Sequence, residues 1–149
     1  MWQLPDIDRD PRVHDAKRTV GAQHRYGKLN EQSILEYARS HKFEEAIVGL
    51  SLLCSLPVEV VERALLDDKR EMTLVLAKAL DFSWETTMSL LFLGSKDHRI
   101  SAGNLDSMKE EFAHLNAETS QSVLRFYQSR KSLAATETEF RRLPQLHAQ

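Results

Sequence analysis

The sequence predicts an all-α fold, and three observations carry this prediction. The chain of 149 residues contains only five glycines and four prolines, which favours long regular elements over turn-rich β structure. Apolar residues recur at the i, i+3, i+4 spacing of helices that bury one face. A pattern of bulky apolar residue, glutamate and leucine also recurs, at Leu56, Glu59 and Leu65, at Phe82, Glu85 and Leu91, and at Leu115, Glu118 and Leu124. Self-similarity of this kind is typical of stacked helical units.

The repeat extends beyond the three-residue pattern. At one constant spacing, Glu45, Leu50, Glu59 and Leu65 recur as Glu71, Leu76, Glu85 and Leu91. Short helices are marginal alone, so each unit must bury its apolar face against a neighbour. We therefore expect about seven or eight helices in stacked antiparallel hairpins, forming either a short HEAT-like solenoid or a compact helical bundle.

The first elements are an arm and two helices. Residues 1–12 contain Pro5 and Pro11 among charged residues and are expected to form an irregular arm. A helix is predicted over 13–26, because Gly27 can end it in a left-handed conformation. A second helix should follow to about residue 40, with Asn30 as its N-cap.

The middle of the chain predicts three further helices. Apolar spacing predicts a helix over 43–54, and Ser55 is expected to cap the next, with Pro57 in its first turn. Asp67 or Asp68 should then cap a helix to residue 80 that is apolar nearly all round and therefore central.

The C-terminal part predicts three more helices around a polar connection. Ser83 should cap a helix that stops at Gly94, and the polar residues 95–103 then connect it to a helix ending near Leu115. Asn116 should cap the final helix, to about residue 133. The expected organisation is a single helical-repeat domain over 13–133 and a frayed tail over 134–149.

Composition excludes several classes of function. The net charge of −2 gives no expectation of nucleic acid or an acidic membrane surface. The single cysteine, Cys54, excludes an intrachain disulfide and is expected to be buried. No apolar run is long enough for a membrane span and no signal peptide is visible, so we expect a cytoplasmic protein.

No residue pattern predicts catalysis, a cofactor or a metal. Glu111 and His114 have the Glu-x-x-His spacing of di-iron bundles, but a second such motif is missing. The recurring Glu59, Glu85 and Glu118 either line a surface for a basic partner or stabilise helix N-termini, and the second interpretation is simpler. We therefore expect a protein that is not an enzyme.

Four residues are candidates for an interaction surface. Trp84 either packs over its own hairpin or anchors a partner, a role that tryptophan often has. The last helix contributes Arg125, Arg130 and Lys131. Residues 72–93 also resemble a helix-turn-helix, but the second helix has no Lys or Arg to contact phosphates.

Several segments resemble a known family. They are Gly27-Lys28-Leu29-Asn30, Leu56-Pro57-Val58-Glu59-Val60-Val61, Phe82-Ser83-Trp84-Glu85-Thr86 and Leu124-Arg125-Phe126. Together they resemble the C-terminal part of the bacterial, mainly alphaproteobacterial, family called domain of unknown function 2336. The resemblance implies a helical fold and no established catalytic residues.

The expected function is thus a non-enzymatic helical-repeat module that binds an unknown protein partner and could act in regulation. Self-association through the N-terminal hairpin is a further expectation, since a first hairpin has an unpaired face. The alternatives are a nucleic-acid-binding regulator, although nucleic acid is an unlikely partner, and a small-ligand-binding helical domain. No cofactor and no membrane partner are expected.

Overall fold

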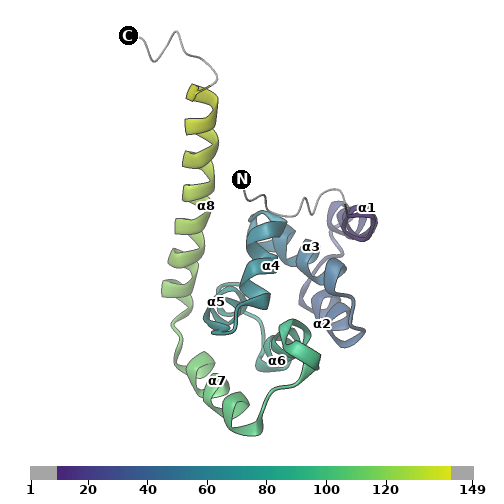
Figure 1. Cartoon of the computed structure of the whole chain (residues 1–149), viewed down its shortest axis with the longest axis vertical. Coiled ribbons are helices and arrows are strands. Elements are labelled where there is room, and N and C mark those ends of the chain that lie inside the picture. The colour runs from purple at the N-terminus through teal and green to yellow at the C-terminus, as the bar shows by residue number, and fades with distance from the viewer. Residues whose placement is uncertain (1–9, 142–149) are drawn as a thin grey trace.

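A computed structural model describes residues 10–141, with side chains described to residue 130. Within this range the chain forms eight α-helices and one short 3₁₀ turn, and no strand (Figure 1). Their bounds are α1 Pro11–Arg25, α2 Glu31–Arg39, α3 Phe43–Cys54, α4 Val58–Leu66, α5 Glu71–Ala79, α6 Trp84–Gly94, η2 Lys96–His98, α7 Ala102–His114 and α8 Ala117–Arg141. The predicted all-α class and number of helices are confirmed.

Helices distant in the sequence pack together in the body α1–α6. α3 packs on α1, and α2 packs on α6, which belongs to a later hairpin of the predicted repeat. In a solenoid each unit would contact only its neighbours. The α2–α6 contact therefore favours the compact bundle, which is one of the two predicted arrangements. The repeated leucines Leu50, Leu65, Leu76 and Leu91 are all buried in this core.

Three helix starts follow the predicted capping chemistry. The Asn30 side chain accepts a hydrogen bond from the Ser33 N–H at 3.1 Å, and Ser83 accepts one from the Thr86 N–H at 3.4 Å. Asn116 accepts one from the Thr119 N–H at 3.1 Å. Each cap satisfies an N–H group that has no partner inside its own helix.

Two predicted caps are wrong. Ser55 has φ 55° and ends α3 in a left-handed conformation, while Pro57 is the residue before α4. Asp67 accepts a hydrogen bond from the Lys69 N–H at 3.0 Å and so forms a turn instead of starting a helix. Because of this turn α5 starts later than expected, after Arg70.

The helical region also extends beyond the predicted boundaries. Asp10 caps α1, which begins at Pro11 inside the expected arm, and the remaining arm residues 1–9 lie outside the described residues. At the other end α8 continues to Arg141, although a frayed tail was expected from residue 134. Residues 142–149 of that tail also lie outside the described range.

One glycine sets the spacing of two central helices. A Cβ atom built on Gly94, at the end of α6, would lie 2.1 Å from the main-chain oxygen of Leu65 in α4. Only a residue without a side chain allows this approach of the two backbones. Gly94 therefore brings the end of α6 against α4.

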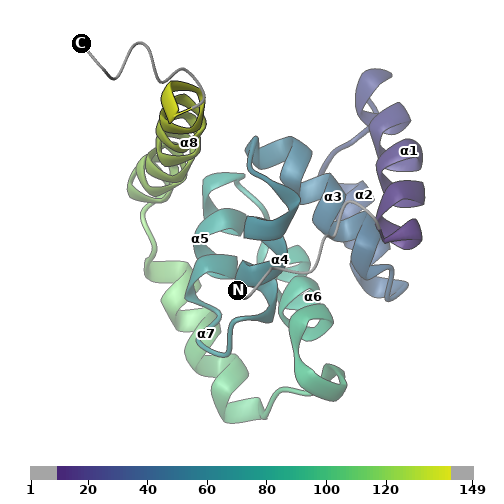
Figure 2. The same cartoon turned by 45° about the horizontal axis from the view of Figure 1, so that its top comes forward.

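α7 and α8 lie along one side of the body. α7 contacts α5 and α6, and α8 packs mainly on α5. Figures 1 and 2 show α8 as a long helix whose C-terminal part extends away from the other helices. Most residues of α8 between positions 117 and 130 are exposed.

Candidate interaction surface

The inner face of α8 holds the helix against the body. Leu124 is buried there, and the side-chain amide of Gln128 donates a hydrogen bond to the Cys54 carbonyl at 2.5 Å. Ser120 is also buried, but its hydroxyl has no hydrogen-bond partner among the described residues. An unpaired buried hydroxyl costs free energy, so the contact between α8 and α5 is not fully optimised.

Two aromatic residues are exposed on the same helix. Phe126 is 58% exposed and Tyr127 is 38% exposed, and their rings meet edge to face with centroids 5.8 Å apart. The Arg130 guanidinium lies 5.9 Å from the centre of the Phe126 ring, within the range of a cation–π interaction. Together they form an aromatic patch, which we define as Phe126, Tyr127 and Arg130.

A shallow groove adjoins the aromatic patch. It has a volume of about 280 Å³ and lies between α4, the start of α5 and α8. Tyr127 forms one wall, and the other walls contain the apolar side chains of Val60, Ala64 and Met72. Arg63 and Asp67 complete the lining. We call this the α4–α8 groove.

The structure separates the four predicted surface residues. Trp84 is half-buried, and its ring lies 5.8 Å from that of Phe112 in α7, so part of it packs against a later helix. Arg125 and Arg130 are exposed, but five helical positions place them about 140° apart around α8. Only Arg130 belongs to the aromatic patch. The side chain of Lys131 lies outside the described residues.

The sequence interpretation missed Phe126, Tyr127 and the groove. The available signal was helical periodicity, since Ser120 and Leu124 are the buried residues of this segment and lie one turn apart. Phe126 then falls about 160° around the helix from Leu124, and Tyr127 about 60° from it. Exposed aromatic residues are a stronger sign of protein binding than arginines alone.

A glutamate from one helix caps another. The Glu31 carboxylate of α2 accepts hydrogen bonds from the N–H and hydroxyl of Ser83, at 2.9 and 2.8 Å, and from the Thr86 hydroxyl at 2.6 Å. Desolvation raises the pKa of Glu31, but the hydrogen bonds from Thr86 and Ser83 together outweigh it, so the pKa is lowered. Glu31 therefore stabilises the start of α6 as an anion.

One of the repeated glutamates, Glu85, has an ion-pair partner in another helix. Glu85 forms an ion pair with Arg39 of α2 and so links the same two helices as Glu31. Both side chains are more than half exposed, which keeps the contribution of this pair small. For Glu85 this position supports the interpretation as a helix-start residue.

The described residues contain no group of three or more His, Cys, Asp or Glu that could hold a metal ion. His114, from the Glu-x-x-His motif, has its Nδ1 at 2.7 Å from the Glu110 carbonyl oxygen of its own helix. Cys54 is buried, and desolvation raises the pKa of its thiol to about 12, which leaves it unreactive in the folded state. Among the described helices none is long and apolar enough to cross a membrane.

The fold and the surface define a compact all-α domain with an aromatic patch on its last helix. A family model, described as uncharacterised protein conserved in bacteria (DUF2336), matches residues 3–125. The chain therefore belongs to this bacterial family, as the resemblance predicted. No curated protein matches the chain, and no solved structure does. Trp84 lies within the matched residues, whereas Phe126, Tyr127 and Arg130 lie just beyond them.

Proposed function

We propose that this protein is a non-enzymatic, cytoplasmic protein-interaction module that binds its partner through the aromatic patch and the α4–α8 groove. The exposure of Phe126 and Tyr127 side by side on α8 is the observation that carries the proposal. Leaving large aromatic rings in water is unfavourable, and binding a partner would bury them.

Charge defines the kind of partner that would fit. Arg63 in the groove and Arg130 on the patch are exposed, and Asp67 is the one acidic side chain among the described residues that line the groove. Charge complementarity therefore favours a protein segment with an apolar anchor side chain and acidic neighbours. The apolar anchor would lie over Val60 and Met72, next to Tyr127.

Site-specific crosslinking in the native host tests this proposal. A photoreactive phenylalanine analogue replaces Phe126 in one strain, and in a control strain it replaces Gln121, an exposed residue about 140° around α8 from Phe126. We expect a defined protein adduct from position 126 and none from position 121. Equal adducts at both positions, or none at position 126, would contradict the proposal.

The partner recovered from position 126 then allows a binding measurement. Tyr127→Ala should weaken its binding by tenfold or more, about 1.4 kcal/mol, as expected for an aromatic anchor. Gln121→Ala, at an exposed position elsewhere on α8, should leave the affinity unchanged. An unchanged affinity in Tyr127→Ala would exclude the α4–α8 groove as the binding site.

Nucleic-acid binding is less well supported. α6, the second helix of the possible helix-turn-helix, packs against α2, α5 and α7. Its buried residues are Thr86, Thr87, Leu90, Leu91 and Leu93, and its first turn carries the acidic Glu85. A recognition helix needs a free face and cations for the phosphates. Binding to random duplex DNA at low salt would nevertheless restore this alternative.

A further inference from the structure

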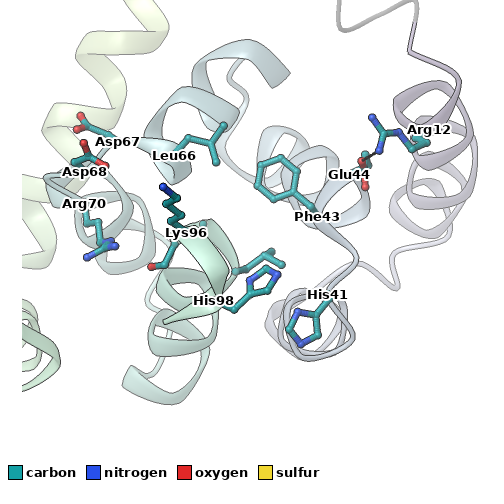
Figure 3. Close-up of a pocket in the computed structure, with 13 residues that line it drawn as sticks. Arg12, His41, Phe43, Glu44, Leu66, Asp67, Asp68, Arg70, Lys96 and His98 are labelled. Atoms are coloured by element: carbon teal, nitrogen blue, oxygen red, sulfur yellow. Dashed lines mark ion pairs between the residues drawn. The ribbon is translucent and has the colours of Figure 1, made fainter. Parts of the chain in front are cut away.

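A second, larger cleft shares Asp67 with the α4–α8 groove but none of the groove's other lining residues. It has a volume of about 570 Å³ and forms where the α2–α3 turn, the start of α3, the α4–α5 turn and the end of α6 meet (Figure 3). Phe43, Leu66, Lys96, His41 and His98 are among the residues that line it. A cleft of this size matches the dimensions of a small-molecule site.

Two apolar side chains face each other across this cleft. Leu66 is 52% exposed, which is unusual for a leucine in the described part of the chain, and it lies opposite Phe43 in Figure 3. Phe43 is half-buried, with part of its ring packed on the core. These two side chains could hold an apolar group between them.

Two imidazole rings form another wall of the cleft. The His41 and His98 rings meet edge to face, with centroids 4.5 Å apart and planes at 74°. The Nδ1 atom of His98 lies 3.1 Å from the Phe92 carbonyl oxygen, and since a carbonyl only accepts, Nδ1 must donate. This hydrogen bond restrains the His98 ring, whose plane is nearly perpendicular to that of His41.

Lys96 supplies a positive charge to a lining that also contains two arginines and three carboxylates. Its ammonium group has no partner among the described residues, and Figure 3 shows it directed towards the Leu66 side of the cleft. Arg12, in contrast, forms an ion pair with Glu44 at 3.6 Å. Asp67 and Asp68 lie beyond Lys96 at the outer edge in this view, near Arg70. Lys96 therefore offers, on the Leu66 side of the cleft, a cation that has no ion-pair partner among the described residues.

The start of α3 offers free N–H groups at the cleft, and its first turn also carries the acidic Glu44 and Glu45. No side chain caps this helix, so N–H groups of its first turn keep their hydrogen-bonding capacity. Phe43, its first residue, lines the cleft. A helix N-terminus carries partial positive charge and favours an anion.

We propose that this cleft binds a small organic anion. The apolar body of the ligand would lie between Leu66 and Phe43 and against the imidazole rings. A carboxylate or phosphate group attached to it would contact the Lys96 ammonium. This site shares neither Phe126 nor Tyr127 with the proposed interaction surface, so either proposal can fail without the other.

A nuclear magnetic resonance titration of the full chain tests the proposal with four probes. Phenyl phosphate and phenylacetate carry the two possible anionic groups on one aromatic body. Benzyl alcohol has the body without the charge, and inorganic phosphate has the charge without the body. We expect saturable shifts of the amide signals of His41, Phe43, Leu66 and Lys96 with at least one aromatic anion, and markedly weaker binding of the other two probes.

Two variants test the roles of the walls. Lys96→Ala should weaken binding of the aromatic anion about tenfold, the value for loss of one charge-assisted contact. Leu66→Ala should also weaken it, and since both side chains are exposed, the fold should remain intact. Lys109→Ala, at an exposed site on α7, is the matched control and should bind normally.

Three results would overturn the proposal. One is the absence of saturable shifts at these residues up to about 20 mM probe, because a dissociation constant above that concentration would mean that the cleft has no useful affinity. Another is equal binding of benzyl alcohol, which would show that charge is not recognised. The third is unchanged affinity of the aromatic anions for Lys96→Ala.

Discussion

The body α1–α6 and the C-terminal pair α7–α8 bury their side chains to very different extents. In the body, apolar residues from every helix meet in one core, with Ile34, Leu50 and Leu90 at 1% exposure or less. In the described part of α7 and α8 only Met108, Phe112 and Leu124 are buried apolar residues. The body therefore supplies most of the stability, and the outer pair leaves more of its described side chains exposed.

The difference also extends to polar groups. In the body, Glu31 and Arg39 of α2 are paired with Ser83, Thr86 and Glu85 at the start of α6. Under α8, by contrast, the Ser120 hydroxyl is buried without a partner among the described residues. Among the described residues, the polar side chains between α2 and α6 are thus paired, whereas the Ser120 hydroxyl under α8 is not.

The largest expected effect is the loss of a central leucine. Leu50→Ala should lower the free energy of unfolding by about 4 kcal/mol, because it leaves a cavity among packed helices. Leu124→Ala, under α8, should cost about 2 kcal/mol, since a peripheral site can collapse or admit water. Urea denaturation measures both. Equal losses would mean that α8 is as integral to the fold as α3.

A second test adds a methyl group instead of removing one. Gly94→Ala should destabilise the protein by about 3 kcal/mol, because its Cβ would overlap the Leu65 carbonyl in the body. Gly103→Ala in α7 is the matched control, since a Cβ at that position would have no neighbour within 4 Å among the described residues. Alanine also has the higher helix propensity, so the control should be neutral or slightly stabilising. Similar thermal unfolding midpoints would contradict the close approach of α4 and α6.

The Glu31 contact gives a pH-dependent prediction. Because the pKa of Glu31 is lowered in the fold, its ionised form stabilises the protein above the ordinary value of 4.5, and this contribution is lost as the pH falls through the folded-state pKa. Glu31→Gln should cost about 1 kcal/mol at pH 7, limited by solvent screening, and much less at pH 3.

Urea denaturation at both pH values measures this effect. Glu110→Gln, at an exposed site on α7, provides the control and should change stability little at either pH. A loss for Glu31→Gln that is the same at pH 3 and pH 7 would show that the charge of Glu31 does not stabilise α6.

The smallest expected effect has the opposite sign. Ser120→Ala should stabilise the protein by about 0.5–1 kcal/mol, because it removes a buried hydroxyl that has no partner among the described residues. Amide hydrogen exchange should then slow in α8 and remain unchanged in α3. If Ser120→Ala destabilises the protein, the hydroxyl has a partner, such as an ordered water, and the contact of α8 is better satisfied than proposed.

Local chemistry explains which parts of the fold could be predicted. Asn30, Ser83 and Asn116 cap helices as expected, because a cap depends on only the next few residues. The pairing of α2 with α6 was not predictable, since it depends on contacts between residues such as Glu31 and Thr86 that are far apart in the sequence. Periodicity shows which face of a helix is apolar but not which helix covers it.

The same reason limits prediction of the interaction surface. Arg130 was a candidate because of its charge, and its position over Phe126 follows from their i, i+4 spacing on one helix. The exposure of both side chains depends instead on which face of α8 packs on α5. Tryptophan is a residue type that often anchors a binding partner, yet Phe112 from a later helix packs against part of the Trp84 ring. Exposure is a property of the assembled helices, and one helix alone does not determine it.

The length of α8 has a mechanical consequence. Its 25 residues form one helix of about 37 Å, a length similar to the diameter of a small domain. A straight helix transmits rotation as well as distance, so a small tilt at Gln128, near the body, would move residue 141 by a larger amount. A partner that tilts α8 on binding would thereby convert a local contact into a displacement that a second molecule can detect.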